Sequence, residues 1–246
     1  MIGQKIIHLD TVDSTNNYTA NLQKEGKIQH GTVILADEQS AGRGQRGASW
    51  TSNAGENLLL SVYLTPDNLS VVDQPALTHF ISLSLIDFLR KIGISGKIKW
   101  PNDIYVNDLK IAGILIENSI RSSRITETII GVGFNVNQKT FHDVKATSLS
   151  VQTNQHFQLK DVLFSWIQEM NSLWTELNKG NFTMLKSRYK QELYLLNEPA
   201  IYCDLEGEFV GVIRDVDNHG YLILEKDAER KKYDLKEIKL VGRNTL

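Results

Sequence analysis

Two short stretches of the chain hold the residues best suited to chemistry. Residues 99–103 (KWPND), followed by Lys110, place a fixed cation beside a rigid turn, whereas residues 42–47 (GRGQRG) form a flexible, cationic, glycine-rich loop. Arginine binds phosphate or carboxylate through two parallel hydrogen bonds, and glycines let backbone N–H groups approach the same ligand. Together the two stretches are suited to bringing a carboxylate and a phosphate into contact.

The loop at residues 42–47 matches the spacing of known nucleotide-binding motifs but completes none of them. A dinucleotide-binding GxGxxG unit also needs a helix at the loop and an acidic residue about twenty positions later. Residues 48–55 lack the pattern of a helix start, and residues 61–64 contain no acid. A Walker A loop requires lysine where Ala48 stands, and the HRD and DFG motifs of kinases do not occur. The alternative is an exposed basic turn, but its glycines and arginines together with Trp50 favour a ligand-binding loop.

The surrounding sequence predicts the elements that position these stretches. Apolar runs predict strands over residues 5–10, 32–36, 57–64, 97–100, 104–106, 111–117 and 127–136. Helical periodicity predicts helices over 15–25, 75–92, 159–177 and 182–196, with Gly93 ending the second. Asn107 and Asp108 predict a hairpin turn, so the strands on either side should be antiparallel neighbours.

Two other places combine structural and functional interpretations. Ser14, Thr15 and Asn16 precede the first predicted helix, and from the residues alone an N-cap is the simplest explanation. Gly131 and Gly133 interrupt a predicted strand. Glycine inside a strand often marks a point where a ligand or another backbone comes close.

The composition of the chain changes at residues 197–199. From Ile201 onward, short β-rich runs alternate with turns such as 205–208 and 217–220. This pattern predicts a small β-barrel. We therefore expect one domain over residues 1–196 and a second over residues 197–246.

Composition argues against several classes of protein. The formal net charge of −2 does not suit a general polyanion binder. Cys203 is the only cysteine, and the histidines form no HExxH pair, so no disulfide within the chain and no tightly bound metal are expected. The N-terminus lacks a signal-peptide hydrophobic region, and no apolar run approaches membrane-spanning length. A cytoplasmic location without membrane association is the expectation.

Five ordered motifs give the chain a specific resemblance to the biotin–protein ligases. Residues 42–50 (GRGQRGASW) resemble the GRGRxGRxW-type loop of this family, and residues 99–103 are similar to its KWPND motif. Residues 110–115 (KIAGIL) look like its KxxGIL segment, and residues 131–136 (GVGFNV) look like its GxGxN element. Residues 14–16 (STN) match the triplet near the start of its catalytic domain. The resemblance covers the catalytic domain and extends to the C-terminal barrel.

The resemblance implies an α+β protein: a mixed β-sheet with flanking helices, in the biotin/lipoate ligase catalytic fold related to class II synthetases, followed by a small SH3-like barrel. It implies that biotin and ATP, supplied with Mg²⁺, form biotinyl-5′-AMP. Biotin then passes to a lysine of the biotin carboxyl carrier domain of a carboxylase. The family contains both monomers and homodimers, and both remain open here.

The resemblance also assigns residues to each role. The biotin-binding residues would be Ser14, Thr15, Asn16, Gln39, Arg43, Gly44, Gln45, Lys110 and Gly113. The ATP-binding residues would be Arg43, Arg46, Trp50, Asn102 and Asn135. Lys110, Arg43 and Asp103 would be the catalytic residues.

The chemistry explains why cations are needed. The attack of a carboxylate on the α-phosphate brings two anions together, and cations placed in advance lower that barrier. Lys110 and Arg43 are the candidates. In the second step Asp103 would accept or orient the proton of the carrier lysine, unless it is only a turn residue. The loop would open for entry and close to keep water from the mixed anhydride.

Some departures from the family pattern and some alternatives remain. Certain members have arginine where Gln45 and Ala48 stand, and some have a nucleotide-facing arginine in the last strand, for which Lys239 or Arg243 would substitute here.

The nearest alternative is a lipoate or octanoate ligase or transferase of the same fold. A biotin-responsive repressor needs a winged-helix domain before the catalytic core, and Ser14 lies close to Met1. We therefore expect the short form, without DNA binding. A non-catalytic binding module would be expected to lack Lys110 or Arg43, and both are present.

Overall fold

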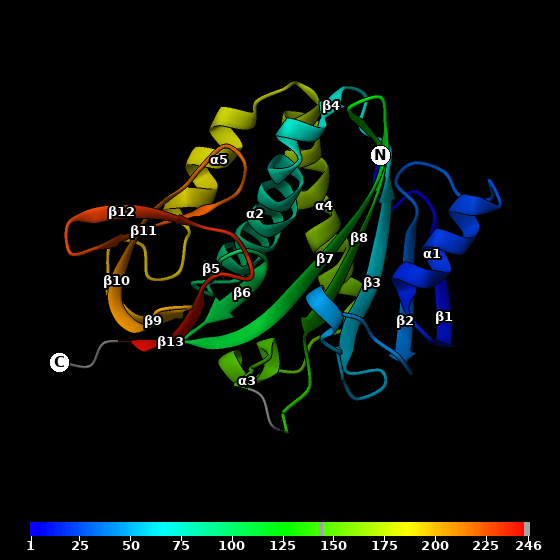
Figure 1. Cartoon of the computed structure of the whole chain (residues 1–246). Helices are drawn as coiled ribbons and strands as arrows, with labels where there is room; N and C mark the ends of the chain where they lie inside the picture. The colour runs from blue at the N-terminus through cyan, green and yellow to red at the C-terminus, as the bar shows by residue number, and fades with distance from the viewer. Residues whose placement is uncertain (143–144, 244–246) are drawn as a thin grey trace.

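The computed structural model describes residues 1–142 and 145–243, with the backbone but not the side chain of Arg46. Within these ranges the main sheet has eight strands, of which seven follow the order β1-β2-β3-β8-β7-β6-β5, while β4 pairs with β8 (Figure 1). The strands are β1 (Ile6–Val12), β2 (Val33–Gln39), β3 (Asn57–Leu64), β4 (Leu69–Ser70), β5 (Lys97–Lys99), β6 (Asp103–Val106), β7 (Leu109–Arg121) and β8 (Arg124–Asn135). Strands β1 and β2 are parallel, and the other pairs are antiparallel. The expected mixed sheet is confirmed.

Helices cover both faces of the main sheet. On one face lie α2 (Pro75–Lys91) and α4 (Leu159–Asn178), with α5 (Phe182–Gln191) packed beside α2, and on the other lies α1 (Thr15–Lys24). Phe134 of β8 makes edge-to-face contacts with Phe88 of α2 and Trp166 of α4, at 5.9 and 6.0 Å between ring centroids. Gly131 and Gly133 of the same strand lie on the opposite face of the sheet, the α1 side, because successive strand residues face opposite sides.

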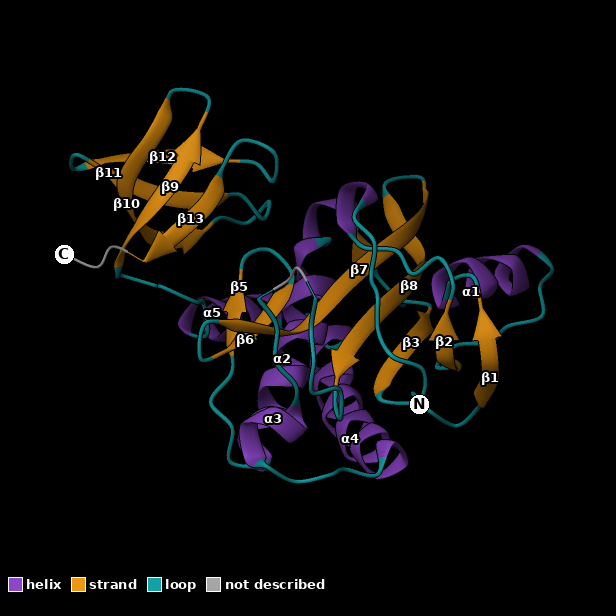
Figure 2. Cartoon of the chain, turned by 90° about the horizontal axis from the view of Figure 1, so that it is seen from below, coloured by secondary structure: helices purple, strands orange, loops and turns teal. Residues whose placement is uncertain are grey.

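The described residues from 199 onward form a second, five-stranded antiparallel sheet. Its strands are β9 (Pro199–Asp204), β10 (Gly207–Val216), β11 (Leu222–Lys226), β12 (Glu229–Tyr233) and β13 (Lys239–Arg243), in the order β12-β11-β10-β9-β13. The sheet curls into a small barrel-like unit beside β5 and β6 (Figure 2). Trp100 fastens it to the main sheet by donating its indole N–H to the carbonyl of Gly220 at 3.0 Å. Arg243 also bonds both carboxylate oxygens of Asp108, at 2.8 and 2.9 Å.

One predicted helix is shorter than expected. The periodicity predicts a helix over 182–196, but α5 ends at Gln191. The amide of Ile98 donates to the carbonyl of Glu192, and the amide of Tyr194 donates to the carbonyl of Ile98, both at 2.8 Å. Residues 192–194 therefore satisfy the edge of β5 instead of continuing the helix. Strands β7 and β8 are longer than predicted, and the short helix α3 (Leu149–Thr153) was not predicted.

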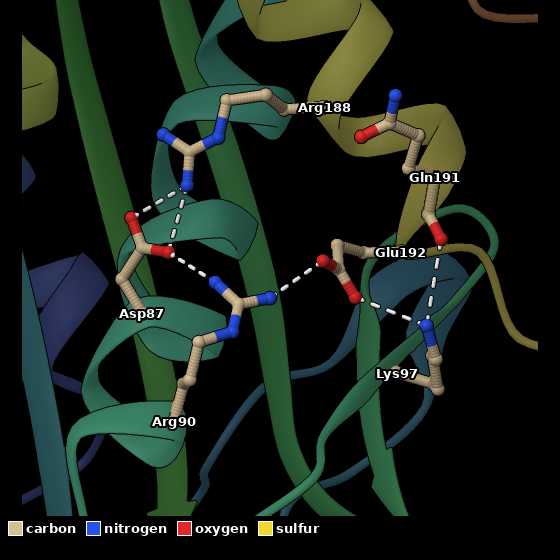
Figure 3. Close-up of polar contacts among 6 residues, drawn as sticks. All are labelled: Asp87, Arg90, Lys97, Arg188, Gln191 and Glu192. Carbon is tan, nitrogen blue, oxygen red and sulfur yellow. Dashed lines mark hydrogen bonds and ion pairs between the residues drawn. The ribbon is translucent and has the colours of Figure 1, made fainter.

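A cluster of ion pairs holds α2, α5 and β5 together (Figure 3). Asp87 of α2 accepts hydrogen bonds from Arg90 at 2.9 Å and from Arg188 of α5 at 2.7 and 2.8 Å. Glu192 accepts from Arg90 at 2.6 Å and from Lys97 of β5 at 3.0 Å.

No helix in the described part of the chain is both long enough and apolar enough to span a bilayer.

Candidate active site

A cavity of about 210 Å³ opens on the α1 side of the main sheet. Strands β7 and β8 form its floor, α1 borders it, and the loop at residues 42–50 lies over it. Most of the predicted site residues line it, drawn from segments far apart in the sequence: Ser14, Thr15, Asn16, Gln39, Arg43, Gly44, Gln45, Trp50, Asn102, Asp103, Lys110 and Gly113. The side chain of Arg46 is outside the described residues, and Asn135 does not line the cavity.

Glycines leave room for Trp50 on the cavity floor. Gly113 and Gly133 pair directly across β7 and β8. A Cβ atom at Gly133 would lie 2.2 Å from the Trp50 ring, and one at Gly113 would lie 3.0 Å from it. The indole packs against the sheet because these residues have no side chains. Its Nε1–H is buried and has no hydrogen-bond partner among the described residues.

Lys110 and Asp103 form an ion pair at this floor. The Lys110 Nζ lies 2.7 Å from Asp103 Oδ1 and 5.4 Å from the Trp50 ring centroid. The strand register passes from Ile104–Ala112 to Tyr105–Lys110, which leaves Ile111 as the extra residue of a β-bulge. Residues 110 and 113 would face opposite sides of a regular strand, and the bulge brings both to the cavity.

Asn135 acts on the backbone beside Lys110 rather than in the cavity. Its side chain is buried, and its amide donates to the carbonyl of Thr147 at 3.0 Å. The amide of Thr147 in turn donates to the carbonyl of Lys110 at 2.9 Å. The structure thus places Asn135 where it fixes the segment that pairs with Lys110. A direct contact between Asn135 and a nucleotide stays a prediction.

The segment 14–16 forms a polar wall. Ser14 is the N-cap residue of α1 by position, but its side chain makes no capping hydrogen bond, so the capping interpretation holds only for its place in the chain. The amide of Thr15 donates to Gln39 Oε1 at 2.7 Å. The hydroxyl of Ser61 on β3 lies 2.8 Å from the Thr15 hydroxyl and 2.6 Å from Asn16 Oδ1.

Arg43 of the loop is held by two side chains. Its guanidinium donates to Glu117 of β7 at 2.7 Å and to Asn17 of α1 at 2.6 Å. Glu117, Asn17 and Ser61 were not singled out by the sequence reasoning. Ser61 and Glu117 are polar residues within apolar strand runs, and this interruption is the signal that would have indicated them.

The other residues of the KWPND motif make hydrogen bonds with neighbouring elements. The Asn102 amide donates to the carbonyl of Ile114, and the carbonyl of Pro101 accepts from the Tyr189 hydroxyl at 2.7 Å. Lys99 points elsewhere and donates to the Tyr105 hydroxyl at 3.0 Å. Neither of the two residues considered as substitutes for a nucleotide-facing arginine lines the cavity: Lys239 borders a different hollow, and Arg243 is bound by Asp108 and Glu198.

A second hollow, of about 450 Å³, lies between the main sheet and the barrel-like unit. It shares Gln45 and Asn102 with the cavity, so the two spaces adjoin. Its wall includes His79, whose ring packs 4.5 Å from that of Tyr189. Burial, followed by the charge of Lys186, lowers the pKa of His79 to about 3.

Comparison with known proteins agrees with this geometry. A model of the Biotin/lipoate A/B protein ligase family matches residues 9–135. The bifunctional ligase/repressor BirA of Bacillus spizizenii is 30% identical over 247 residues, which span 98% of this chain and 75% of that protein. The biotin–[acetyl-CoA-carboxylase] ligase of Paracoccus denitrificans is 28% identical over 94% of this chain and 98% of its own length. The biotin protein ligase of Aquifex aeolicus, solved in complex with biotin and ATP, superposes with a TM-score of 0.78 and 27% identity, covering 97% of this chain and 99% of that chain.

The chain therefore belongs to the biotin/lipoate A/B protein ligase family. Its main sheet, flanking helices and C-terminal barrel-like unit are the fold of the biotin protein ligases within that family. The resemblance inferred from the five motifs is confirmed.

Proposed function

We propose that the cavity binds biotin and ATP, and that the chain acts as a biotin–protein ligase in two steps. Biotin and ATP form biotinyl-5′-AMP with release of pyrophosphate. The biotinyl group then passes to a lysine amine of a biotin carboxyl carrier domain, and AMP leaves. The observation that carries this proposal is the meeting of Lys110 and Arg43 with residues 14–16 at one cavity.

The two cations serve the first step. Lys110 would neutralise the biotin carboxylate and the α-phosphate as they approach, and the Asp103 carboxylate at 2.7 Å holds the ammonium in place. Arg43 would bind the same charge from the loop side. A preorganised cation contributes more as negative groups converge than it does in the ground state. The unpartnered Nε1–H of Trp50 and the amide of Asn102 would face the nucleotide.

The polar wall suits the ring system of biotin. Gln39, Ser14, Thr15 and Asn16 present hydroxyl and amide groups to the cavity. A ureido group both donates and accepts hydrogen bonds, which matches such a wall. Gly44 and Gln45 would close over the ligand with the loop.

We expect Mg²⁺ to arrive with ATP and to be held chiefly by the phosphates. Asp103, which lines the cavity, and Glu117, which binds Arg43 of the loop, are each already paired with a cation. Among the described residues, no group of three His, Cys, Asp or Glu side chains is placed to hold a metal ion. A bound Mg²⁺ would neutralise phosphate charge and favour the departure of pyrophosphate.

For the second step, we propose that Asp103 accepts or orients the proton of the incoming lysine. The place of Asp103 in the cavity lining, beside Lys110, supports this role. We also propose that residues 1–196 form the catalytic domain, that residues 197–246 form the barrel, and that the reaction takes place in the cytoplasm. The Bacillus relative is named a ligase/repressor, and we extend only the ligase activity to this chain.

The test is biotin-dependent exchange of label between pyrophosphate and ATP, measured without any carrier. Exchange with biotin, followed by label transfer to a biotin carboxyl carrier domain, is the expected result. Lipoate and octanoate are the competing substrates. Exchange with either of these but not with biotin would overturn the substrate assignment while leaving the family unchanged.

A further inference from the structure

One carboxylate outside the cavity lining gathers three separate segments. Glu117 lies on β7, with its side chain 36% exposed. One of its oxygens accepts from Arg43 of the loop at 2.7 Å, and the other accepts from Asn16 Nδ2 of α1 at 2.7 Å. Since residues 112–121 of β7 pair with β8, the carboxylate has a rigid base.

The contacts around Asn16 fix the direction of its amide. A carboxylate can only accept hydrogen bonds, so Glu117 requires the NH₂ group of Asn16 on its side. The Ser61 hydroxyl, 2.6 Å from Oδ1, then donates to the amide oxygen. A Cβ atom at Gly131 would lie 2.3 Å from Asn16 Oδ1, so the Asn16 side chain occupies the space that this glycine leaves. With Nδ2 bonded to Glu117 and Oδ1 bonded to Ser61, the orientation of the Asn16 amide is fixed.

Arg43 has a second, uncharged support. Asn17 Oδ1 accepts from the guanidinium at 2.6 Å, and Asn17 Nδ2 donates to Asp13 at 2.7 Å. This bond from Asn17 holds the pKa of Asp13 below its usual value. Asp13 thus orients Asn17 as Glu117 orients Asn16. The Arg43–Glu117 pair is the charged support, and it is exposed enough to open with the loop.

We infer that Glu117 is a positioning residue: it orients Asn16 toward biotin and ties the loop at residues 42–50 to the sheet through Arg43. The inference rests on the proposed function, because that function gives Asn16 and Arg43 their ligand. Glu117 itself touches neither biotin nor the reacting atoms. It makes the polar wall and the loop depend on one group.

The test uses Glu117→Gln, with Glu169→Gln as the matched control. Glu169 is also a partly exposed glutamate in an ion pair, but it lies on α4, on the opposite face of the main sheet, and its partner is Lys91. In ligand-free protein, trypsin should cut the loop of Glu117→Gln up to roughly fivefold faster, the factor expected from losing an exposed ion pair. Biotin binding, measured by calorimetry, should weaken about tenfold, because hydrogen bonds to a charged group are lost. The control should match the wild type in both measurements.

Two further variants separate positioning from general stability. Glu117→Asp keeps the charge but reaches only one partner, so it should restore part of the affinity. In an Asn16→Ala background, Glu117→Gln should weaken biotin binding by less than it does in the wild type, since the Asn16 amide that it orients is gone and only the tie to Arg43 is lost. Unchanged trypsin cleavage and biotin affinity in Glu117→Gln, or full additivity with Asn16→Ala, would overturn the inference. A wild-type protein that fails to bind biotin would refute the proposed function instead, and the trypsin comparison would still test the tie to Arg43.

Discussion

The ion pairs beside the cavity and those between α2, α5 and β5 use the same residue types in different surroundings. In the second group, shown in Figure 3, Asp87 and Glu192 each accept from two cations, and the charges bridge packed elements. At the cavity, Lys110 and Arg43 are each paired with one carboxylate and also border an open volume.

The number of carboxylates around each cation indicates which charges are available for chemistry. An ammonium has three donors and a guanidinium has five, so one carboxylate leaves most of them for a ligand. In the cluster of Figure 3 the cations bind carboxylates that they share, and these ion pairs connect α2, α5 and β5. Removing a charge from the cavity should therefore change rates, whereas removing one from the cluster should change stability.

The largest expected effect is that of Lys110→Ala on adenylation. Losing a cation that acts on converging anions costs on the order of 3 kcal/mol, or roughly a hundredfold or more in rate. The melting temperature should change little, because the Lys110–Asp103 pair is partly exposed. Single-turnover formation of biotinyl-AMP is the measurement, with a thermal melt beside it.

Lys110→Arg is the control for charge without shape. A planar fork does not reproduce a compact ammonium, so this variant should recover only part of the rate. If Lys110→Ala formed the adenylate at the wild-type rate, Lys110 would be an ordinary surface lysine, and the contrast between the two groups of charges would fail.

His79, in the wall of the second hollow, is a buried titratable group and gives a third environment to compare with the two groups of ion pairs. With its pKa lowered to about 3, it stays neutral in the folded protein, while in the unfolded chain it takes up a proton below about pH 6.5. Its contribution to stability is complete above that pH and is lost as the pH falls toward 3. Between pH 7 and pH 5 the wild type should lose about 2 kcal/mol more unfolding free energy than His79→Gln. Urea titrations of both proteins at the two pH values measure this, and equal losses would contradict it.

Asp87→Ala tests the cluster of Figure 3. It leaves Arg90 and Arg188 without a shared acceptor, and the side chain of Asp87 is only 20% exposed. We expect a loss of about 1–2 kcal/mol in unfolding free energy, or about 2–8 °C in melting temperature. The adenylation rate, measured well below the melting temperature, should be unchanged. A slower rate at constant stability would show that the cluster acts on the cavity.

The smallest effect concerns the loop at residues 42–50 in the wild-type protein. Its glycines are costly to order, so ligand should decide how long it stays closed. Biotin should slow trypsin cleavage after Arg43 by a few-fold, and biotin with ATP should slow it further. Cleavage at equal rates with and without ligand would argue against gating by this loop.

Much of the local structure was predictable from the chain. Asn107 and Asp108 adopt φ values of 48° and 64°, as a tight hairpin turn between strands requires. Helix α2 ends just before Gly93, whose φ is 80°, as predicted. These features depend on backbone preferences of a few consecutive residues, which sequence shows directly. The order of the five motifs likewise identified most of the cavity lining before any contact was known.

Other features depend on contacts between segments that lie far apart in the sequence. The predicted helix over 182–196 stops early because the edge of β5 offers hydrogen bonds to residues 192–194. Glu117 and Ser61 gained their roles from α1 and the loop, which are distant in sequence. Lys110 reaches the cavity through the bulge at Ile111, which reverses the side-chain alternation expected from its spacing to Gly113. Residue spacing gives direction only while a strand is regular, and the pairing of β6 with β7 alone determined where that regularity breaks.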